Sequence, residues 1–263
     1  SKITDIFPVN CLGVQTHRDG FATDFDKDAL ERRIRMFRDK NLPEEIVKQT
    51  FGLSDSEEWG LAEQRKRVMA DDAWRQRITP MLYHPFDVRW IFYHDAVVDR
   101  PRKEVMHHMM HDNLALNTMR QTKMPEWRHA VVSNRMAPAV YVEIKDGSNL
   151  FPLYLYPDAD KKDLLTQLSK PAEKKPNLSF ALLRALKEAY KKQPSPEDIF
   201  NYIYAILYAP TYRTRYAEFL KTDFPRVPFT KNQELFKTLA ALGEKLVELH
   251  LLKSPELNKP ICR

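Results

Sequence analysis

The sequence ITPMLYHPFDVRWIFY, residues Ile78–Tyr93, is the strongest indication of the fold. Its two halves, Ile78–Tyr83 and Val88–Tyr93, are rich in aromatic and β-branched residues, and a Pro-containing segment, His84–Asp87, separates them. This composition predicts two strands joined by a turn. Strand-like segments continue toward the C-terminus, at Leu114–Arg120, Ala130–Ser133, Ala139–Ile144 and Leu150–Tyr156.

The residues before this stretch predict a mixture of short strands and helices. Strands are expected at Ile3–Phe7, Leu12–Thr16 and Phe21–Phe25. Asp26 is a good N-cap, and apolar residues then recur at helical spacing, so a helix should run to about Lys40. Further helices are expected from Pro43 to Gly52, from Ser54 to Ala70 and, after the strand pair, from Pro101 to Met110.

The C-terminal third reads as helical throughout. Ser179 and Ser195 are hydroxyl caps, and Pro196 suits the first helical position. Thr230 with Gln233 predicts a capping box for the last long helix. Leucines at helical spacing should form the buried face of that helix: Leu235, Leu239, Leu242, Leu246 and Leu249.

These elements predict an α+β fold, in which a mixed, strand-rich N-terminal lobe precedes a C-terminal all-helical lobe. We expect a segment of strands and helices at residues 1–72, the strand-rich lobe at 73–157, and the helical lobe at 178–263. Residues 158–177 are rich in Lys, Asp and Pro and poor in large apolar residues, which is typical of a surface linker.

Composition limits the class of protein. The 263 residues are 43% hydrophobic and 30% charged, which is typical of a globular protein and not of a disordered one. Cys11 and Cys262 lie at opposite ends, so there is neither a disulfide framework nor a cysteine-based zinc site, and we expect a cytoplasmic location. No apolar run reaches membrane-spanning length. The chain begins at Ser1 without a Met, which suggests a piece of a longer protein.

A basic strip runs from Arg100 to Arg135 and carries a net charge of +4 of the chain's +6. Amide side chains lie between its cations, and Arg pairs well with guanine as Asn and Gln do with adenine. A strip of this kind indicates nucleic acid binding. A solvated surface of mixed charge is the other interpretation, and composition alone favours it.

The sequence contains few residue patterns that indicate catalysis. Six scattered glycines cannot supply a phosphate-binding loop or a dinucleotide fingerprint. His107 and His111 have a spacing that can bind metal, but no third ligand is evident. A nuclease motif of two acids and a lysine is matched in residue type by Asp158 and the run Glu173-Lys174-Lys175. Pro flanks this run on both sides, which favours a linker over the buried strand that such a site needs.

Several stretches together resemble the C-terminal target-recognition region of Type ISP restriction-modification enzymes and of related single-chain N6-adenine DNA methyltransferases. They occur in the family's order and span nearly the whole chain: Gly13–Asp19, Tyr83–Arg89, Arg100–Arg102, Phe151–Tyr156 and, above all, Pro196–Leu252.

The resemblance implies a bacterial enzyme that joins a nuclease, a helicase-like motor, a methyltransferase that uses S-adenosylmethionine, and this recognition region. The methyltransferase tetrapeptide, Asn/Asp-Pro-Pro-aromatic, is absent here, because the sequence has no Pro-Pro. We therefore expect a non-enzymatic recognition fragment without a cofactor of its own, whereas the full-length enzyme would use S-adenosylmethionine, ATP and Mg²⁺. Residues 1–72 would couple it to the methyltransferase.

The expected partners are double-stranded DNA and the methyltransferase and helicase-like domains of the same polypeptide. Charge, side-chain geometry and position select the candidate DNA contacts, and the resemblance does not assign them individually. The candidate base readers are Arg120, Gln121, Asn134 and Arg135, with Asn117 behind them. The candidate phosphate contacts are Arg18, Arg100, Arg102, Lys103, Lys123 and Arg128. Trp127, in a polar stretch, is a candidate for base stacking.

Two alternatives stay open. One is a free-standing metal-dependent nuclease or phosphohydrolase that uses the Asp158/Glu173 set or the His/Asp pairs. The other is a helical lobe that mainly docks protein, which would show an exposed apolar patch.

Overall fold

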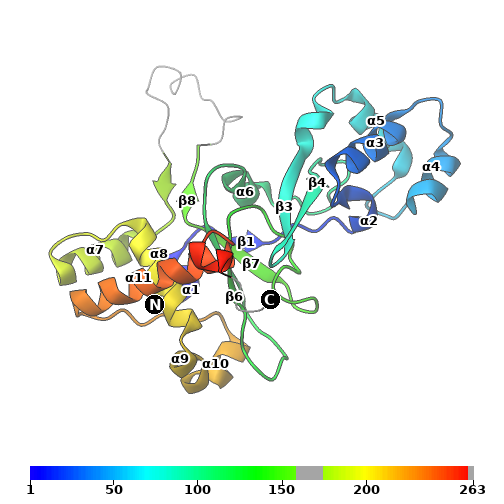
Figure 1. Ribbon diagram of the computed structural model, residues 1–263. Coiled ribbons are helices and arrows are strands. Elements are labelled where there is room, and N and C mark those ends of the chain that lie inside the picture. The colour runs from blue at the N-terminus through cyan, green and yellow to red at the C-terminus, as the bar shows by residue number, and fades with distance from the viewer. Residues whose placement is uncertain (158–173, 260–263) are drawn as a thin grey trace, which may run out of the picture. The chain divides into compact units, whose positions relative to one another are not determined.

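The computed structural model describes residues 1–157 and 174–259, and these divide into two compact units. Residues 14–102 form what we call the hairpin unit, and residues 1–13 together with those from 103 onward form the sheet–helix unit. Both contain strands and helices, which confirms the predicted α+β class (Figure 1). No helix among the described residues is long and apolar enough to cross a membrane.

The hairpin unit is built on the strand pair predicted from Ile78–Tyr93. Strands β3 (Ile78–His84) and β4 (Asp87–Phe92) pair antiparallel, and β2 (Thr23–Asp24) adds to the other edge of β4. Helices α2 (Asp19–Ala22), α3 (Lys27–Arg38), α4 (Glu44–Phe51) and α5 (Leu61–Ala70) complete the unit, with the 3₁₀ helix η1 (Trp74–Arg77).

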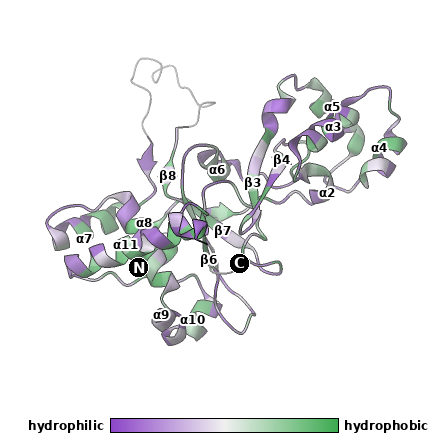
Figure 2. Ribbon diagram, viewed as in Figure 1, coloured by the Kyte–Doolittle hydropathy of each residue, from purple (hydrophilic) through white to green (hydrophobic). Residues whose placement is uncertain are grey.

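One core joins these helices to the hairpin. Leu30, Ile34 and Phe37 of α3 are buried with Ile78 and Phe92 of the hairpin. Figure 2 shows α3 as largely hydrophilic, because only this strip of the helix faces the core. The predicted division near residue 72 therefore does not coincide with the boundary of the unit, since the hairpin shares the core of the helices that precede it.

The sheet–helix unit contains an antiparallel sheet of strand order β1-β7-β5-β6. These strands are β1 (Cys11–Leu12), β5 (Ala115–Met119), β6 (Ala130–Ser133) and β7 (Ser148–Pro152). The short pair β8 (Tyr154–Leu155) and β9 (Lys175–Pro176) follows, while α6 (Lys103–Met106) and the 3₁₀ helix η2 (His107–Met110) precede the sheet.

The C-terminal helices pack onto this sheet and share its core, so they do not form a separate lobe. They are α7 (Phe180–Tyr190), α8 (Pro196–Tyr208), α9 (Pro210–Arg215), α10 (Ala217–Thr222) and α11 (Gln233–His250), with η5 (Pro255–Asn258) after them. Phe151 of β7 and Val132 of β6 belong to the same buried cluster as Phe200 and Ile203 of α8. Residues 158–173, which hold most of the predicted linker, lie outside the described residues.

The first segment is a helix and not the predicted strand. α1 (Ile3–Ile6) buries Ile3, Ile6 and the following Phe7. Residues three and four apart share a helical face. A strand would have placed Asp5 on the face of Ile3 and Phe7, and Asp5 is exposed.

Other predicted boundaries also shift. Of Leu12–Thr16 only Leu12 is in strand β1, and Phe21–Phe25 divides between α2 and β2. Residues 139–144 form turns and bends instead of a strand, with the buried Tyr141 donating its hydroxyl to Val132 O at 3.2 Å. The helix expected from Ser54 begins only at Leu61, whose backbone N–H is capped by Asp55 Oδ1 at 2.7 Å.

The buried face of helix α11 is rotated relative to the predicted leucine row, of which Leu239 and Leu246 are half-buried and pack against the core. Its buried residues are Phe236, Ala240, Gly243 and Val247, while Leu242 is 50% exposed. Its cap is Asn232, which accepts from the N–H groups of Glu234 and Leu235. The small residues face inward because α11 lies directly against α8 (Figure 1).

Gly243 is required at this contact. A Cβ at Gly243 would lie 1.8 Å from the carbonyl oxygen of Asn201 in α8, which is closer than two non-bonded heavy atoms can approach. We expect Gly243→Ala to lower the free energy of unfolding by about 1–3 kcal/mol through overpacking. The gain in helix propensity of about 1 kcal/mol does not offset the clash.

Denaturant unfolding measures this effect, and Gly20→Ala is the control. Gly20 is also helical, and a Cβ there meets nothing within 4 Å. Equal stability of the two variants would contradict the close packing of α8 against α11.

Candidate nucleic-acid interface

The loop between β5 and β6, residues Arg120–His129, brings together four of the predicted DNA contacts. β5 ends at Met119 and β6 begins at Ala130, so the loop closes a pair of adjacent antiparallel strands. Arg120, Gln121, Lys123 and Arg128 are all exposed on it. The side chains of Arg120 and Arg128 are 74% and 76% exposed, which leaves N–H groups available to a partner.

Helices α9 and α10 hold this loop on one side. The Thr122 N–H donates to the carbonyl oxygen of Lys221 in α10 at 3.0 Å. The Met124 N–H donates to Thr122 Oγ1 at 3.1 Å, which closes a turn at the tip. The loop is therefore shaped by its own turn and by a helix about a hundred residues later in the chain.

Trp127 anchors the loop and is not available for base stacking as expected. Its side chain is 4% exposed and belongs to the core shared by the sheet and the helices. The Arg213 guanidinium lies 5.6 Å from the Trp127 ring centroid and 4.3 Å from that of Tyr208. Burial lowers the pKa of Arg213, whose Nε donates to Leu207 O at 2.7 Å. Both residues stabilise the loop from inside.

The remaining predicted base readers lie away from this loop. Asn134 and Arg135 are half-buried and follow β6 at its other end. The four residues of β6 put about 13 Å between them and the loop. Asn117, in the middle of β5, is 1% exposed and donates to Ser133 Oγ at 2.8 Å. Its amide is committed inside the sheet, which argues against a base-reading role.

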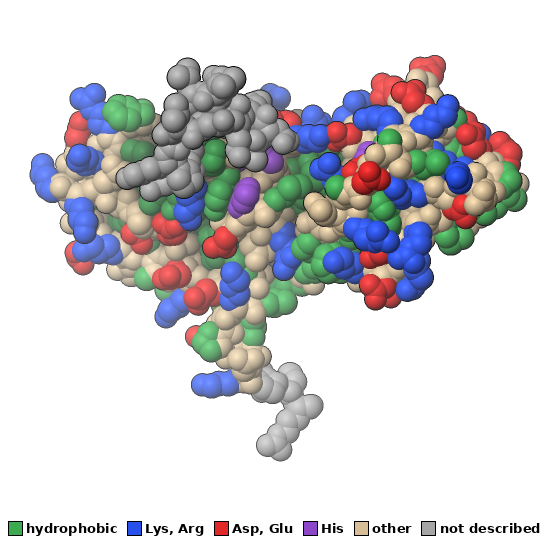
Figure 3. Space-filling model, turned by 90° about the horizontal axis from the view of Figure 1, so that it is seen from above, with side chains coloured by type: hydrophobic (Ala, Val, Ile, Leu, Met, Phe, Trp, Pro, Cys, Tyr) green, Lys and Arg blue, Asp and Glu red, His purple; other side chains and the backbone are tan. Residues whose placement is uncertain are grey.

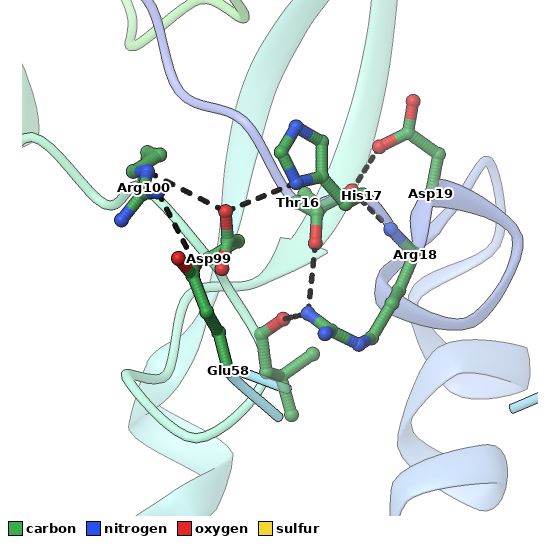
Figure 4. Close-up of polar contacts among 8 residues, drawn as sticks. Thr16, His17, Arg18, Asp19, Glu58, Asp99 and Arg100 are labelled. Carbon is green, nitrogen blue, oxygen red and sulfur yellow. Dashed lines mark hydrogen bonds and ion pairs between the residues drawn. The ribbon is translucent and has the colours of Figure 1, made fainter. Parts of the chain in front are cut away.

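In the hairpin unit, Arg18 and Arg100 line a cleft of about 640 Å³. Arg18 donates to the carbonyl oxygens of Thr16 and Val97, both at 3.2 Å, and its guanidinium lies 4.1 Å from the Trp59 ring centroid. Burial lowers the pKa of Arg18, and Asp99 opposes that effect. Arg18 thus holds the N-terminal segment against the rest of this unit (Figure 4).

Acidic side chains balance the cations in this cleft. Arg100 Nη2 lies 3.3 Å from Glu58 Oε2, and Arg100 Nε lies 3.5 Å from Asp99 Oδ2 (Figure 4). Asp99 also pairs with Nδ1 of the exposed His17 at 3.0 Å, and Glu57 lines the same cleft. A phosphate would meet three carboxylates beside two guanidinium groups, so the cleft is poorly suited to a bare anion.

Arg102 and Lys103 are the residues where the chain passes from one unit to the other. Arg102 has a φ of 56°, a backbone conformation that is strained for a side chain of this size. Its Nε is buried without a hydrogen-bond partner among the described residues. Lys103 is exposed at the start of α6.

The net charge of the chain, +6 over 263 residues, is a modest excess of cations. On the face seen in Figure 3, Lys and Arg side chains lie interspersed with Asp and Glu. Binding to an anionic polymer would therefore depend on local groups such as those of the β5–β6 loop, and long-range attraction would be modest.

The described residues give no support to a metal site. Across residues 1–157 and 174–259, no three His, Cys, Asp or Glu side chains are grouped so that they could hold a metal ion. The 3₁₀ helix ends at Met110, so His111 lies outside it and stacks on Tyr156 instead, with the ring centroids 4.4 Å apart. Asp158 and Glu173 lie outside the described residues.

No local sequence pattern predicted the residues that support the loop. Lys221 and Asp223 reach it from the far end of the chain, and Asp223 Oδ1 lies 4.0 Å from Arg120 Nε. Nothing in the local pattern around residue 221 marks it as a neighbour of residue 122. Only a pairing signal between distant positions could have found them.

Several solved structures have a similar fold. The DrdV–DNA complex matches with a TM-score of 0.70 and 23% identity, over 93% of this chain and 23% of that one. The ATP-dependent Type ISP restriction-modification enzyme LlaBIII bound to DNA matches with a TM-score of 0.69 and 22% identity, over 98% of this chain and 16% of that one.

A nuclease-deletion mutant of the Type ISP enzyme LlaGI, in complex with a DNA substrate mimic, matches with a TM-score of 0.64 and 21% identity. That match covers 98% of this chain and 19% of the other. The chain thus spans less than a quarter of each of these proteins. No curated protein matches.

The family model of the Type ISP C-terminal specificity domain matches residues 5–263, which is nearly the whole chain. This chain therefore belongs to the Type ISP C-terminal specificity domain family.

Proposed function

We propose that this chain recognises a specific sequence in double-stranded DNA on behalf of a restriction-modification enzyme. The observation that carries the proposal is the β5–β6 loop, on which Arg120, Gln121, Lys123 and Arg128 are exposed while Trp127 and Thr122 hold the backbone in place. Membership of a specificity-domain family and the DNA complexes among the similar structures support it.

The loop offers both kinds of contact that recognition needs. Lys123 and Arg128 can contact phosphates, which position a protein on the duplex without reading its sequence. Arg120 and Gln121 can present two hydrogen-bonding groups each to the edge of one base. A loop already ordered before binding loses less conformational entropy on DNA.

On this proposal, other parts of a longer polypeptide carry out methylation and the other catalysed reactions. A methyltransferase must turn its target base out of the stack, and it needs another surface to fix the position on the DNA. S-adenosylmethionine would serve that methyltransferase, and ATP with Mg²⁺ would serve a motor. The methyltransferase tetrapeptide is absent from this sequence. The free-standing nuclease is not favoured, because the family is one of specificity domains.

Exposed apolar side chains on the C-terminal helices support a second role, in docking those other parts. Phe180 at the start of α7 and Leu235 and Leu242 on α11 are exposed. Contiguous exposed apolar patches mark contacts with other protein surfaces, so a docking role requires these side chains to lie in one patch.

If the loop binds phosphates, the affinity for DNA should fall as the salt concentration rises. Loss of one phosphate contact should then weaken binding to every DNA sequence alike. Arg128→Ala should remove one phosphate contact and flatten the plot of log affinity against log salt concentration by about one unit of slope. Fluorescence anisotropy with random-sequence and selected duplexes over a range of salt concentrations measures it.

Arg184→Ala is the matched control, because Arg184 is an exposed arginine of α7 that pairs with Glu188 at 2.9 Å, much as Arg128 pairs with Glu126 at 2.6 Å. Its slope should equal that of the wild type. Identical slopes for both variants would mean that the loop does not contact phosphates.

Base reading predicts a different outcome for Arg120→Ala and Gln121→Ala. Each should relax the preference at one base pair, with a loss of about 1–3 kcal/mol of discrimination, and leave the salt slope nearly unchanged. Selection from a duplex library with a randomised core identifies the preferred site and the relaxed position. A wild-type protein that enriches no sequence would contradict the proposed function itself.

A further inference from the structure

Asp223 is a carboxylate placed under the β5–β6 loop that none of the roles above uses. It follows α10 directly, and its Oδ2 lies 2.9 Å from Lys2 Nζ. Its Oδ1 is buried and has no hydrogen-bond partner among the described residues. The hydrogen bond from Lys2 lowers the pKa of Asp223, the Phe224 backbone N–H and the charge of Arg120 act in the same direction, and burial opposes them. The carboxylate is therefore ionised at neutral pH.

The cation that faces Oδ1 is Arg120, whose Nε lies 4.0 Å away. A small rotation of either side chain would bring the two atoms into hydrogen-bond range. A buried carboxylate oxygen without a donor is costly, so such a rotation is favoured. The present geometry leaves the rest of the guanidinium in solvent, since the Arg120 side chain is 74% exposed.

The backbone makes this juxtaposition specific. Thr122, two residues after Arg120, donates its N–H to the carbonyl oxygen of Lys221, two residues before Asp223, at 3.0 Å. The two segments are thus fixed against each other at one point, and Arg120 and Asp223 flank that point on the two segments. The backbone therefore sets the distance between Arg120 and Asp223, and not the side-chain conformations alone.

Pairing with Asp223 would orient the guanidinium of Arg120 for contact with a base. The guanidinium is planar and carries five N–H donors in a fixed fork, and two of them suffice for the O6 and N7 acceptors of guanine. A carboxylate that holds the Nε side leaves the terminal N–H groups free to point outward. It also restricts a long side chain before DNA arrives, so less rotamer freedom is lost on binding.

We propose that Asp223 is a positioning residue for Arg120 and thereby determines how sharply the loop discriminates one guanine-containing base pair. The inference rests on the proposed function, because it assumes that Arg120 reads a base. Asp223 itself contacts no DNA on this proposal, and its effect passes entirely through Arg120.

The test compares Asp223→Asn, Arg120→Ala and the double variant in the full chain. The probes are the duplex that the wild type selects from a randomised library and the same duplex with the pair read by Arg120 replaced. Asp223→Asn should lower the ratio of the two affinities about tenfold, within the range of one good bidentate contact. The double variant should discriminate no worse than Arg120→Ala alone, because the two residues act as one unit.

Two controls separate positioning from charge and from folding. Glu126→Gln also removes one negative charge close to the recognition residues, from the β5–β6 loop itself, where Glu126 pairs with Arg128 at 2.6 Å, and it should keep the wild-type ratio. Lys2→Met removes the other partner of Asp223 and should lower the melting temperature without changing the ratio. If Asp223→Asn does not fold, Asp223→Glu retains the carboxylate and should discriminate better than Asp223→Ala.

Several results would overturn the proposal. An unchanged ratio in Asp223→Asn alongside a lowered ratio in Arg120→Ala would show that Asp223 does not position the arginine, and so would additive losses in the double variant. If Arg120→Ala discriminated between the two duplexes as well as the wild type, Arg120 would not be a base reader, although the chain would still recognise a sequence. A wild-type chain that does not discriminate between selected and random duplexes would instead contradict the proposed function.

Discussion

The burial of Phe7 between the sheet and the helices is the constraint on which the sheet–helix unit depends. Its ring centroid lies 6.3 Å from that of Phe151 in β7 and 6.3 Å from that of Phe200 in α8, and Phe7 is completely buried. The start, middle and end of the chain thus meet at one side chain.

Because β7 pairs with β5, and the β5–β6 loop begins where β5 ends, the same packing fixes the start of the loop. Helices α9 and α10 follow α8 and hold the loop through Lys221 and Arg213. Recognition groups on a surface loop are thereby supported by a rigid core, which is how loops usually acquire binding function.

The division of labour within the loop follows from what each side chain can do. Trp127 is the largest apolar side chain of the loop and fills the core, whereas the cations and the amide remain in solvent. In the hairpin unit, two of the predicted phosphate contacts are already committed to the protein. Arg18 is held by two carbonyl oxygens and an indole ring, and Arg100 lies between two carboxylates. Formal charge alone therefore overstated the number of groups available to DNA, because a guanidinium that satisfies buried carbonyls is a structural element.

Local signals in the sequence predicted local structure well. The aromatic and β-branched composition of Ile78–Tyr93, with its Pro-containing turn, predicted the β3–β4 hairpin, and Asp26, Ser179 and Ser195 cap helices as expected. The errors came from long-range packing. The leucine row of α11 was only partly right: Leu239 and Leu246 pack against the core, but close contact with α8 requires Gly243 and Ala240 to face inward. Helix α1 was taken for a strand because Ile3 and Phe7 suit either period. Within the candidate site, the charged and amide residues of the loop could be named from the sequence. The burial of Trp127 and the approach of Asp223 could not, since both depend on contacts between residues about a hundred positions apart.

The proposed function depends most on Arg120, which we propose reads a base in duplex DNA from the β5–β6 loop. The most direct measurement uses the selected duplex with 7-deazaguanine at the base pair where Arg120→Ala loses discrimination. This base retains its pairing and lacks only the N7 acceptor that an arginine would contact. The account predicts that the wild-type affinity falls about tenfold on the substituted duplex, while the affinity of Arg120→Ala does not change. An equal loss for both proteins, or no loss for the wild type, would contradict it.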